Sequence, residues 1–180
     1  MIEYYTFMHN GNAETYTDEV ILRLVPRLSV AIFYGSKLDN APKSQALLFS
    51  EILSSDEFTK GLTHLSSLYD ECLDSNCEYL ILRVLENGIE SIRRGNVYAK
   101  IIRDGRISTL PNGFFGLSPD DRIICATSRF YESLTDEGIL ADAAVAGSCN
   151  EWMMMMVRRI SDHNQLMRGN LSAVTLKLNE

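Results

Sequence analysis

Short apolar runs dominate the beginning of the chain. Residues 2–8 (IEYYTFM), 18–25 (DEVILRLV) and 28–35 (LSVAIFYG) are separated by the turn-forming residues 9–12 (HNGN) and by Pro26-Arg27. Runs of this length that are rich in Tyr, Val, Ile and Phe favour β-strands over helices. We therefore expect the chain to open with three strands.

The pattern then changes to helical spacing. Pro42 stands where a helix can begin, and the apolar residues of segment 43–55 recur at helical intervals. A second segment, 54–75, has a candidate N-cap at Ser55 and one apolar face, made up of Phe58, Leu62, Leu65, Tyr69 and Cys72. Two helices are therefore predicted after the third strand.

Beyond these helices, the pattern indicates strands joined by tight turns. The apolar-rich segments are 78–86, 89–94, 96–102 and 106–110. Asn87-Gly88 and Asp104-Gly105 supply the positive backbone angles that hairpins need, so we expect these segments to form a meander. The first segment is apolar on both faces except at Arg83, which predicts a strand inside a sandwich.

The last third of the chain combines strands with helices. A strand over 122–127 (RIICAT) follows the turn residues Asp120-Asp121. Two helices come next, the first capped by Thr135 and the second beginning at the capping box Ser148-x-x-Glu151. A strand over 170–178 closes the chain. This order predicts antiparallel sheets packed together with helices outside.

Composition and charge narrow the function classes. The chain has 180 residues, 46% of them apolar, and we expect a single domain over residues 1–180. The net charge of −7 and the lack of a Lys/Arg run argue against nucleic-acid and membrane partners. The N-terminal residues lack the features of a secretory signal, and the most apolar stretch, 20–34, is interrupted by Arg23 and Arg27. A cytoplasmic protein is expected.

Isolated reactive residues give no clear catalytic pattern. The four cysteines form no C-x-x-C pair, and Cys125 lies inside a predicted strand, where a thiol is usually inert. The scattered histidines, His9, His64 and His163, are interpreted as surface or capping residues. The run from Trp152 to Met156 predicts a helix packed on a sheet.

Several local strings resemble one protein family. Residues 120–137, DDRIICATSRFYESLTDE, look like that family's DDRIILATDGLYDxLSDEE segment, and residues 95–105, GNVYAKIIRDG, are similar to its GDSRAYLIRDG hairpin. Residues 168–174, RGNLSAV, stand where the family has its closing S-x-DNITVV strand. Residues 12–15 stand at its NEDA motif and residues 33–36 at its FDGxG motif. The family is the metal-dependent type 2C serine/threonine protein phosphatases.

The resemblance implies a fold and a mechanism. The implied fold is a four-layer α-β-β-α sandwich of two antiparallel sheets flanked by helices. In the family, aspartates at strand ends hold two divalent cations, and a bridging water or hydroxide attacks the phosphorus. In this chain the corresponding positions hold Ser128, Gly169, Tyr34 and Asn96, and Glu14 alone keeps a carboxylate. Because these ions are bound by charge and ligand number, we expect no catalytic residue, metal or other cofactor at these vestigial positions.

These substitutions predict a pseudophosphatase that acts by binding another protein: a kinase, a phosphoprotein or an active phosphatase. The alternative is an active phosphoserine/phosphothreonine phosphatase that uses Mn²⁺ or Mg²⁺ in a site rebuilt around Glu14, Asp18 and Asp39. We interpret Asp18, Asp39 and the later Asp162 as surface charges or caps rather than ligands. A third alternative is a homo-oligomer that associates through a sheet edge or the Met-rich helix.

Two arginines are candidates for phosphate binding. Arg129 and Arg168 each adjoin a vacated metal position, and a guanidinium can bind phosphate oxygens with two parallel hydrogen bonds. However, adjacent residues of a strand point to opposite faces, so sequence neighbourhood does not aim either side chain into the vacated site. Exposed arginines that pair with acids are the simpler interpretation.

Overall fold

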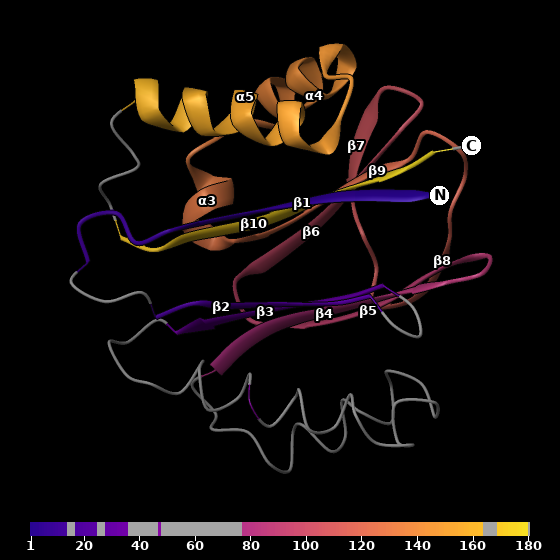
Figure 1. Ribbon diagram of the computed structural model, residues 1–180, viewed down its shortest axis with the longest axis horizontal. Helices are drawn as coiled ribbons and strands as arrows, with labels where there is room; N and C mark the ends of the chain where they lie inside the picture. Colours follow the sequence, from indigo (N-terminus) through magenta and orange to yellow (C-terminus); the bar gives the residue numbers. More distant parts are fainter. Residues whose placement is uncertain (14–16, 25–27, 36–46, 48–76, 164–168, 180) are drawn as a thin grey trace. The chain divides into compact units, whose positions relative to one another are not determined.

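The computed structural model describes residues 1–13, 17–24, 28–35, 47, 77–163 and 169–179 (Figure 1). Apart from Leu47, which is helical, the two helices predicted within 42–75 lie outside these residues. The described strands are β1 (Ile2–His9), β2 (Glu19–Arg23), β3 (Ser29–Gly35), β4 (Cys77–Leu85), β5 (Gly88–Arg94), β6 (Val97–Arg103), β7 (Arg106–Thr109), β8 (Gly113–Gly116), β9 (Arg122–Thr127) and β10 (Leu171–Leu178). The described helices are α3 (Ser128–Glu132), α4 (Asp136–Val145) and α5 (Cys149–Asp162).

The contacts within the chain divide it into two compact units. The first contains the described residues of Met1–Tyr16, Tyr98–Leu110 and Leu117–Glu180. The second contains those of Thr17–Val97 and Pro111–Gly116. Each unit is built around one five-stranded sheet. The prediction of a single domain over 1–180 is not tested by this division and stays a prediction.

The sheet of the first unit has the strand order β1-β10-β9-β6-β7. The N-terminal strand β1 pairs antiparallel with the C-terminal strand β10 along its whole length, from Ile2↔Leu178 to His9↔Leu171. Strands β6 and β7 form the predicted hairpin, in which Asp104 and Gly105 have φ of 50° and 67°. The ends of the chain therefore lie side by side in one sheet (Figure 1).

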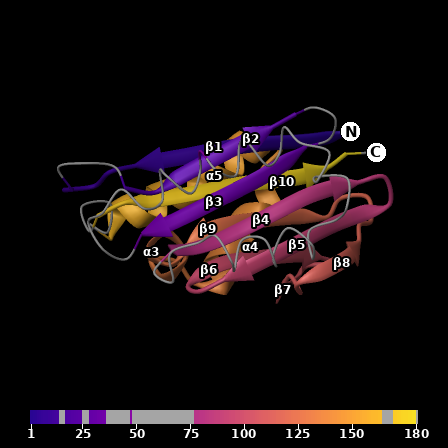
Figure 2. The same ribbon diagram turned by 90° about the horizontal axis from the view of Figure 1, so that it is seen from below.

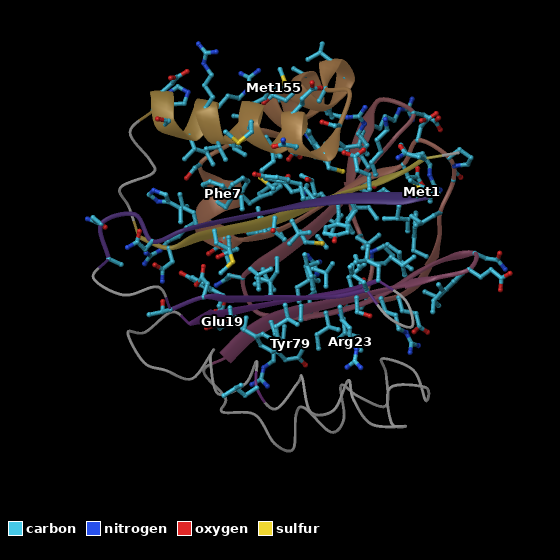
Figure 3. All side chains as sticks on the ribbon, in the orientation of Figure 1. Met1, Phe7, Glu19, Arg23, Tyr79 and Met155 are labelled. Atoms are coloured by element: carbon cyan, nitrogen blue, oxygen red, sulfur yellow. The ribbon has the colours of Figure 1, made fainter. Side chains whose placement is uncertain are left out.

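Helix α5 packs on β1 and β10, and α4 packs on α5. Trp152, Met153, Met156 and Ile160 are completely buried, whereas Met154 is 50% exposed, so the Met-rich segment is an amphipathic helix as predicted. Within α3, Phe130 contacts Phe7 of β1 with a ring centroid distance of 5.9 Å, and Figure 3 shows Phe7 beside this helix. These residues belong to one apolar cluster between the sheet and its helices.

Both predicted N-caps are present. The Gly138 amide of α4 donates to the Thr135 hydroxyl at 3.1 Å, and the Glu151 amide of α5 donates to the Ser148 hydroxyl at the same distance. The Glu151 carboxylate reaches back to the Gly147 amide at 2.7 Å. Among the described residues, no helix is both long and apolar enough to cross a membrane.

The sheet of the second unit has the order β2-β3-β4-β5-β8, and Figure 2 shows its strands side by side. Strand β4 is central, as its two apolar faces predict, and Tyr79 to Leu82 are almost completely buried. Arg83 is also buried, and its guanidinium is paired with the Glu90 carboxylate of β5 at 2.5 Å. This pairing allows one charged residue in an otherwise apolar strand.

The predicted four-strand meander is wrong at one connection. Strand β5 pairs with β4 and β8, whereas β6 belongs to the other sheet. The two residues between β5 and β6 explain the break. Gly95 has φ of 79°, and the Asn96 amide, which a hairpin would use for strand pairing, donates instead to the Glu78 carboxylate at 2.7 Å. The sequence pattern does not predict the short strand β8, which consists of the four residues GFFG.

Candidate functional site

In the first unit, the vacated metal positions lie where β9 and β10 part. The two strands pair up to Ala126↔Ala173. Beyond that pair, the Thr127 hydroxyl accepts a hydrogen bond from the Ser172 amide at 3.3 Å and lies 3.4 Å from the Ser172 carbonyl. The chain then turns into α3 at Ser128. A buried side-chain contact thus fixes the point at which the backbone leaves the sheet.

Ser128 and Arg129 are oriented by the first turn of α3. Ser128 is 7% exposed, and the following Phe130 and Tyr131 anchor the helix in the apolar cluster. Arg129 lies on the exposed side of the helix. Because these residues are helical rather than extended, the alternation expected of a strand does not apply to Arg129.

The Arg129 guanidinium occupies the space beside Gly169. Gly169 has φ of 110°, a conformation that residues with a side chain rarely adopt. A Cβ atom at this position would lie 1.7 Å from Arg129 Nη1 and 3.0 Å from Arg129 Cζ. A side chain at position 169, a carboxylate included, would therefore require the end of the Arg129 side chain to move. Arg168, the second phosphate-binding candidate, lies outside the described residues.

In the second unit, two further vacated positions lie around Glu78. Tyr34 at the end of β3 is 7% exposed and is the register partner of Glu78 on β4. The Glu78 carboxylate accepts hydrogen bonds from the Asn96 amide at 2.7 Å and from Asn96 Nδ2 at 3.5 Å. Glu78 also leaves no room for a side chain at Gly95, where a Cβ would lie 2.5 Å from Glu78 Cγ. Glu78 was missed by sequence analysis, because an acid at a strand start carries no signal until the strands are paired.

The interpretation of Asp18 as a surface charge is wrong. Asp18 directly precedes β2 and is 0% exposed. The other proposed members of a rebuilt site, Glu14 and Asp39, lie outside the described residues. Asp162, at the end of α5, is exposed as expected. Within the described part of the chain, no three His, Cys, Asp or Glu side chains are grouped so that they could hold a metal ion.

The positions described here do not fit the family's two metal ions. Ser128 offers a neutral hydroxyl, Tyr34 a buried phenol, and Gly169 no side chain. A cation, the Arg129 guanidinium, lies against Gly169, where a divalent ion would require an anion. These positions therefore lack the anionic ligands that a two-metal reaction needs.

Other candidate residues have structural roles. Burial raises the pKa of the Cys125 thiol from 9.0 to about 12, so the thiolate that a nucleophile needs is scarce near neutral pH. His9 Nδ1 accepts a hydrogen bond from the Gly11 amide at 2.8 Å, and His163 is the C-cap of α5. Asp120 is a turn residue, as predicted, with φ of 66°.

Asp121 is predicted only as a turn residue, but its side chain also makes buried hydrogen bonds. Its carboxylate, 1% exposed, accepts hydrogen bonds from Arg103 Nε at 2.8 Å and from the Ser118 amide at 2.6 Å. The side-chain hydrogen bond between Arg103 and Asp121 raises the pKa of the Arg103 guanidinium. Asp121 therefore ties the β6–β7 hairpin to the segment that precedes β9.

No protein-family model matches the sequence, and no curated protein matches it. Solved structures do match. The photosystem II phosphatase PBCP is 11% identical, with a TM-score of 0.83 and 99% of each chain covered. The Mycobacterium tuberculosis serine/threonine phosphatase PstP/Ppp is 12% identical, with a TM-score of 0.77 and 99% of each chain covered. The PstP catalytic domain in complex with 2 manganese ions is also 12% identical, with a TM-score of 0.72 and the same coverage.

These likenesses extend over almost the whole of each chain, and they confirm the predicted fold class of two antiparallel sheets with helices. The outer helices predicted for the second unit lie outside the described residues. The chain therefore has the fold of the metal-dependent type 2C serine/threonine phosphatases.

Proposed function

We propose that this protein is a pseudophosphatase, a non-catalytic module with a phosphatase fold that acts by binding another protein. The observation that carries the proposal is the guanidinium of Arg129 against Gly169, where the family sequence has an aspartate. This position thus has a cation where the family has an anionic ligand.

Like charges repel, so a guanidinium beside the position of a missing ligand disfavours a divalent cation there. Ser128, which directly precedes Arg129, has a hydroxyl and supplies no carboxylate at this point. The proposal therefore includes no metal or other cofactor.

The proposed partner is a cytoplasmic protein: a kinase, a phosphoprotein or an active phosphatase. Arg129 supports a phosphoprotein, because an exposed guanidinium can bind phosphate oxygens without a metal. In this version the phosphate is held and not hydrolysed. Fluorescence anisotropy with phosphoserine peptides tests it, and equal affinity of the wild type and the Arg129→Ala, Arg168→Ala double variant would contradict phosphate recognition.

The alternative is an active enzyme with a rebuilt metal site. Its one described member, Asp18, is completely buried, but it also has a partner within the chain, so its burial alone does not require a metal. In this alternative, Asp18 with Glu14 and Asp39 would bind Mn²⁺ or Mg²⁺, and the chain would hydrolyse phosphoserine or phosphothreonine.

A turnover assay separates the two functions. The purified protein is incubated with an aryl phosphate and Mn²⁺ or Mg²⁺, while its melting temperature is followed with and without metal. The proposal predicts no metal-dependent product and no rise in melting temperature beyond that given by a salt of equal ionic strength. Metal-dependent turnover that is lost in Asp18→Asn and Glu14→Gln would support the rebuilt site and overturn the proposal.

A further inference from the structure

The outer face of α4 is unusually apolar. Ile139 and Ala143 are buried on the inner side of this helix, and Asp142, also buried, receives two hydrogen bonds from Arg159 of α5 at 2.7 Å. On the outer side, Ala141 and Ala144 are exposed and Val145 is 70% exposed. Beyond its first turn, α4 therefore presents no charged side chain to solvent. An exposed apolar face of this kind marks a candidate interaction surface.

A groove runs beside this face, within the first unit. It has a volume of about 570 Å³, which is within the range of ligand-binding clefts. Its walls come from α4, from the β6–β7 hairpin and from the segment that leads into β9. The lining residues are Ile102, Asp104, Gly105, Asp120, Arg122, Leu140, Ala141, Ala143 and Ala144. The groove thus continues the apolar face of α4 to a rim that carries charged residues.

The charged groups that line the groove are two carboxylates and the guanidinium of Arg122. Asp104 and Asp120 are both exposed, and each is held by a turn with positive φ. The basic residues nearby have other roles. Arg103 is paired with Asp121, and Arg122 Nη2 donates to the Ala146 carbonyl at the C-terminus of α4, at 2.9 Å. Arg106 follows the hairpin turn but does not line the groove.

We propose that this groove docks a basic amphipathic segment of a partner protein. Apolar side chains of the segment would cover Leu140, Ala141 and Ala144, and its Lys or Arg side chains would pair with Asp104 and Asp120. Charge complementarity selects this occupant, because the rim carboxylates and the chain's net charge of −7 both favour a basic partner. The site is separate from Arg129 and Gly169, so docking does not depend on whether the chain is catalytically inactive.

A matched pair of peptides tests the proposal. Both carry the same leucines at helical spacing, and the polar face is lysine in one peptide and glutamate in the other. Fluorescence anisotropy at low ionic strength should show saturable binding of the lysine peptide and none of the glutamate peptide. Asp104→Asn combined with Asp120→Asn should weaken binding about tenfold, because two exposed ion pairs are lost while asparagine tolerates the positive φ.

Two further variants complete the test. Ala144→Arg places a cation on the exposed apolar face and should abolish binding of the lysine peptide. Asp162→Asn removes a charge from the exposed end of α5 and should leave binding unchanged, which controls for net charge. The proposal is overturned if the lysine peptide does not bind, if both peptides bind equally, or if the groove variants have no effect. Light scattering that shows a wild-type dimer, made monomeric by Ala144→Arg, would also overturn it, because the face would then bind a second copy.

Discussion

Position 169 combines a backbone conformation that favours glycine with a neighbour that fills the space of a side chain. The φ of 110° favours glycine, and the space that a Cβ would fill is taken by Arg129. A single substitution to aspartate would therefore meet both backbone strain and a steric clash. Restoring this ligand would require the flexible end of the Arg129 side chain to move away, so we expect the two positions to be energetically coupled.

Gly169→Ala tests this pairing. We expect it to lower the free energy of unfolding by about 1 to 3 kcal/mol, and by less in an Arg129→Ala background, where backbone strain remains but the clash is gone. Gly105→Ala is the matched control, because Gly105 also has positive φ but has nothing within 4 Å of its would-be Cβ. Urea unfolding gives each value. Equal costs of Gly169→Ala in the two backgrounds would show that Arg129 does not occupy this space.

At the scale of elements, buried charges connect segments that backbone pairing leaves unconnected. Asp121 joins the β6–β7 hairpin, through Arg103, to the Ser118 amide before β9. Asp142 joins α4 to α5 through Arg159. These carboxylates are 1% and 2% exposed, whereas their arginine partners are partly exposed. Removal of the arginine would therefore leave a buried carboxylate without its cation in each pair.

Arg103→Met tests the first connection. The variant keeps most of the side-chain stem but leaves the Asp121 carboxylate buried without its cation, and we expect a loss of about 3 kcal/mol in the free energy of unfolding. Arg106→Met, on the exposed neighbouring strand β7, is the matched control and should cost less than about 0.5 kcal/mol. Chemical denaturation of both variants provides the comparison. Similar losses in the two would contradict the role given to Asp121.

The elements that sequence predicts well are those whose signals are local. The strand β4 is apolar on both faces, the β6–β7 hairpin has its Asp-Gly turn, and α4 and α5 have their capping residues. The five-residue helix α3 and the strand β8 are too short for a periodic pattern. The predicted meander breaks at Asn96, whose backbone amide donates a hydrogen bond to the Glu78 carboxylate of β4, 18 residues earlier in the chain. A contact of this kind has no signal in the local sequence.

In the candidate site, too, features with a local sequence signal are predicted and features that depend on the folded structure are not. The positions that lack carboxylates can be read from the motifs alone, because each is a substitution at a fixed place in a string. The orientation of Arg129 could not be predicted, since it depends on the helical turn that begins at Ser128. The burial of Asp18 could not be predicted either, because one acid before a strand has no pattern that marks it as internal.

At the scale of the whole molecule, fold and chemistry are separable. The chain matches solved phosphatases over 99% of its length at 11% to 12% identity. Cores tolerate extensive apolar substitution when volume and pattern are kept, so the scaffold needs few identical residues. A metal centre needs particular ligands at particular places. A shared fold therefore does not by itself show a shared reaction, and function has to be argued from the site.

The central claim is that this chain does not bind the two cations on which phosphatases of this fold depend. Electron paramagnetic resonance of Mn²⁺ tests it directly, because the free ion gives a six-line signal that is lost when the ion binds to protein. Our account predicts that Mn²⁺ keeps its full free-ion signal when the protein is added in excess. Saturable loss of that signal at two ions per chain, reversed by Asp18→Asn, would contradict it.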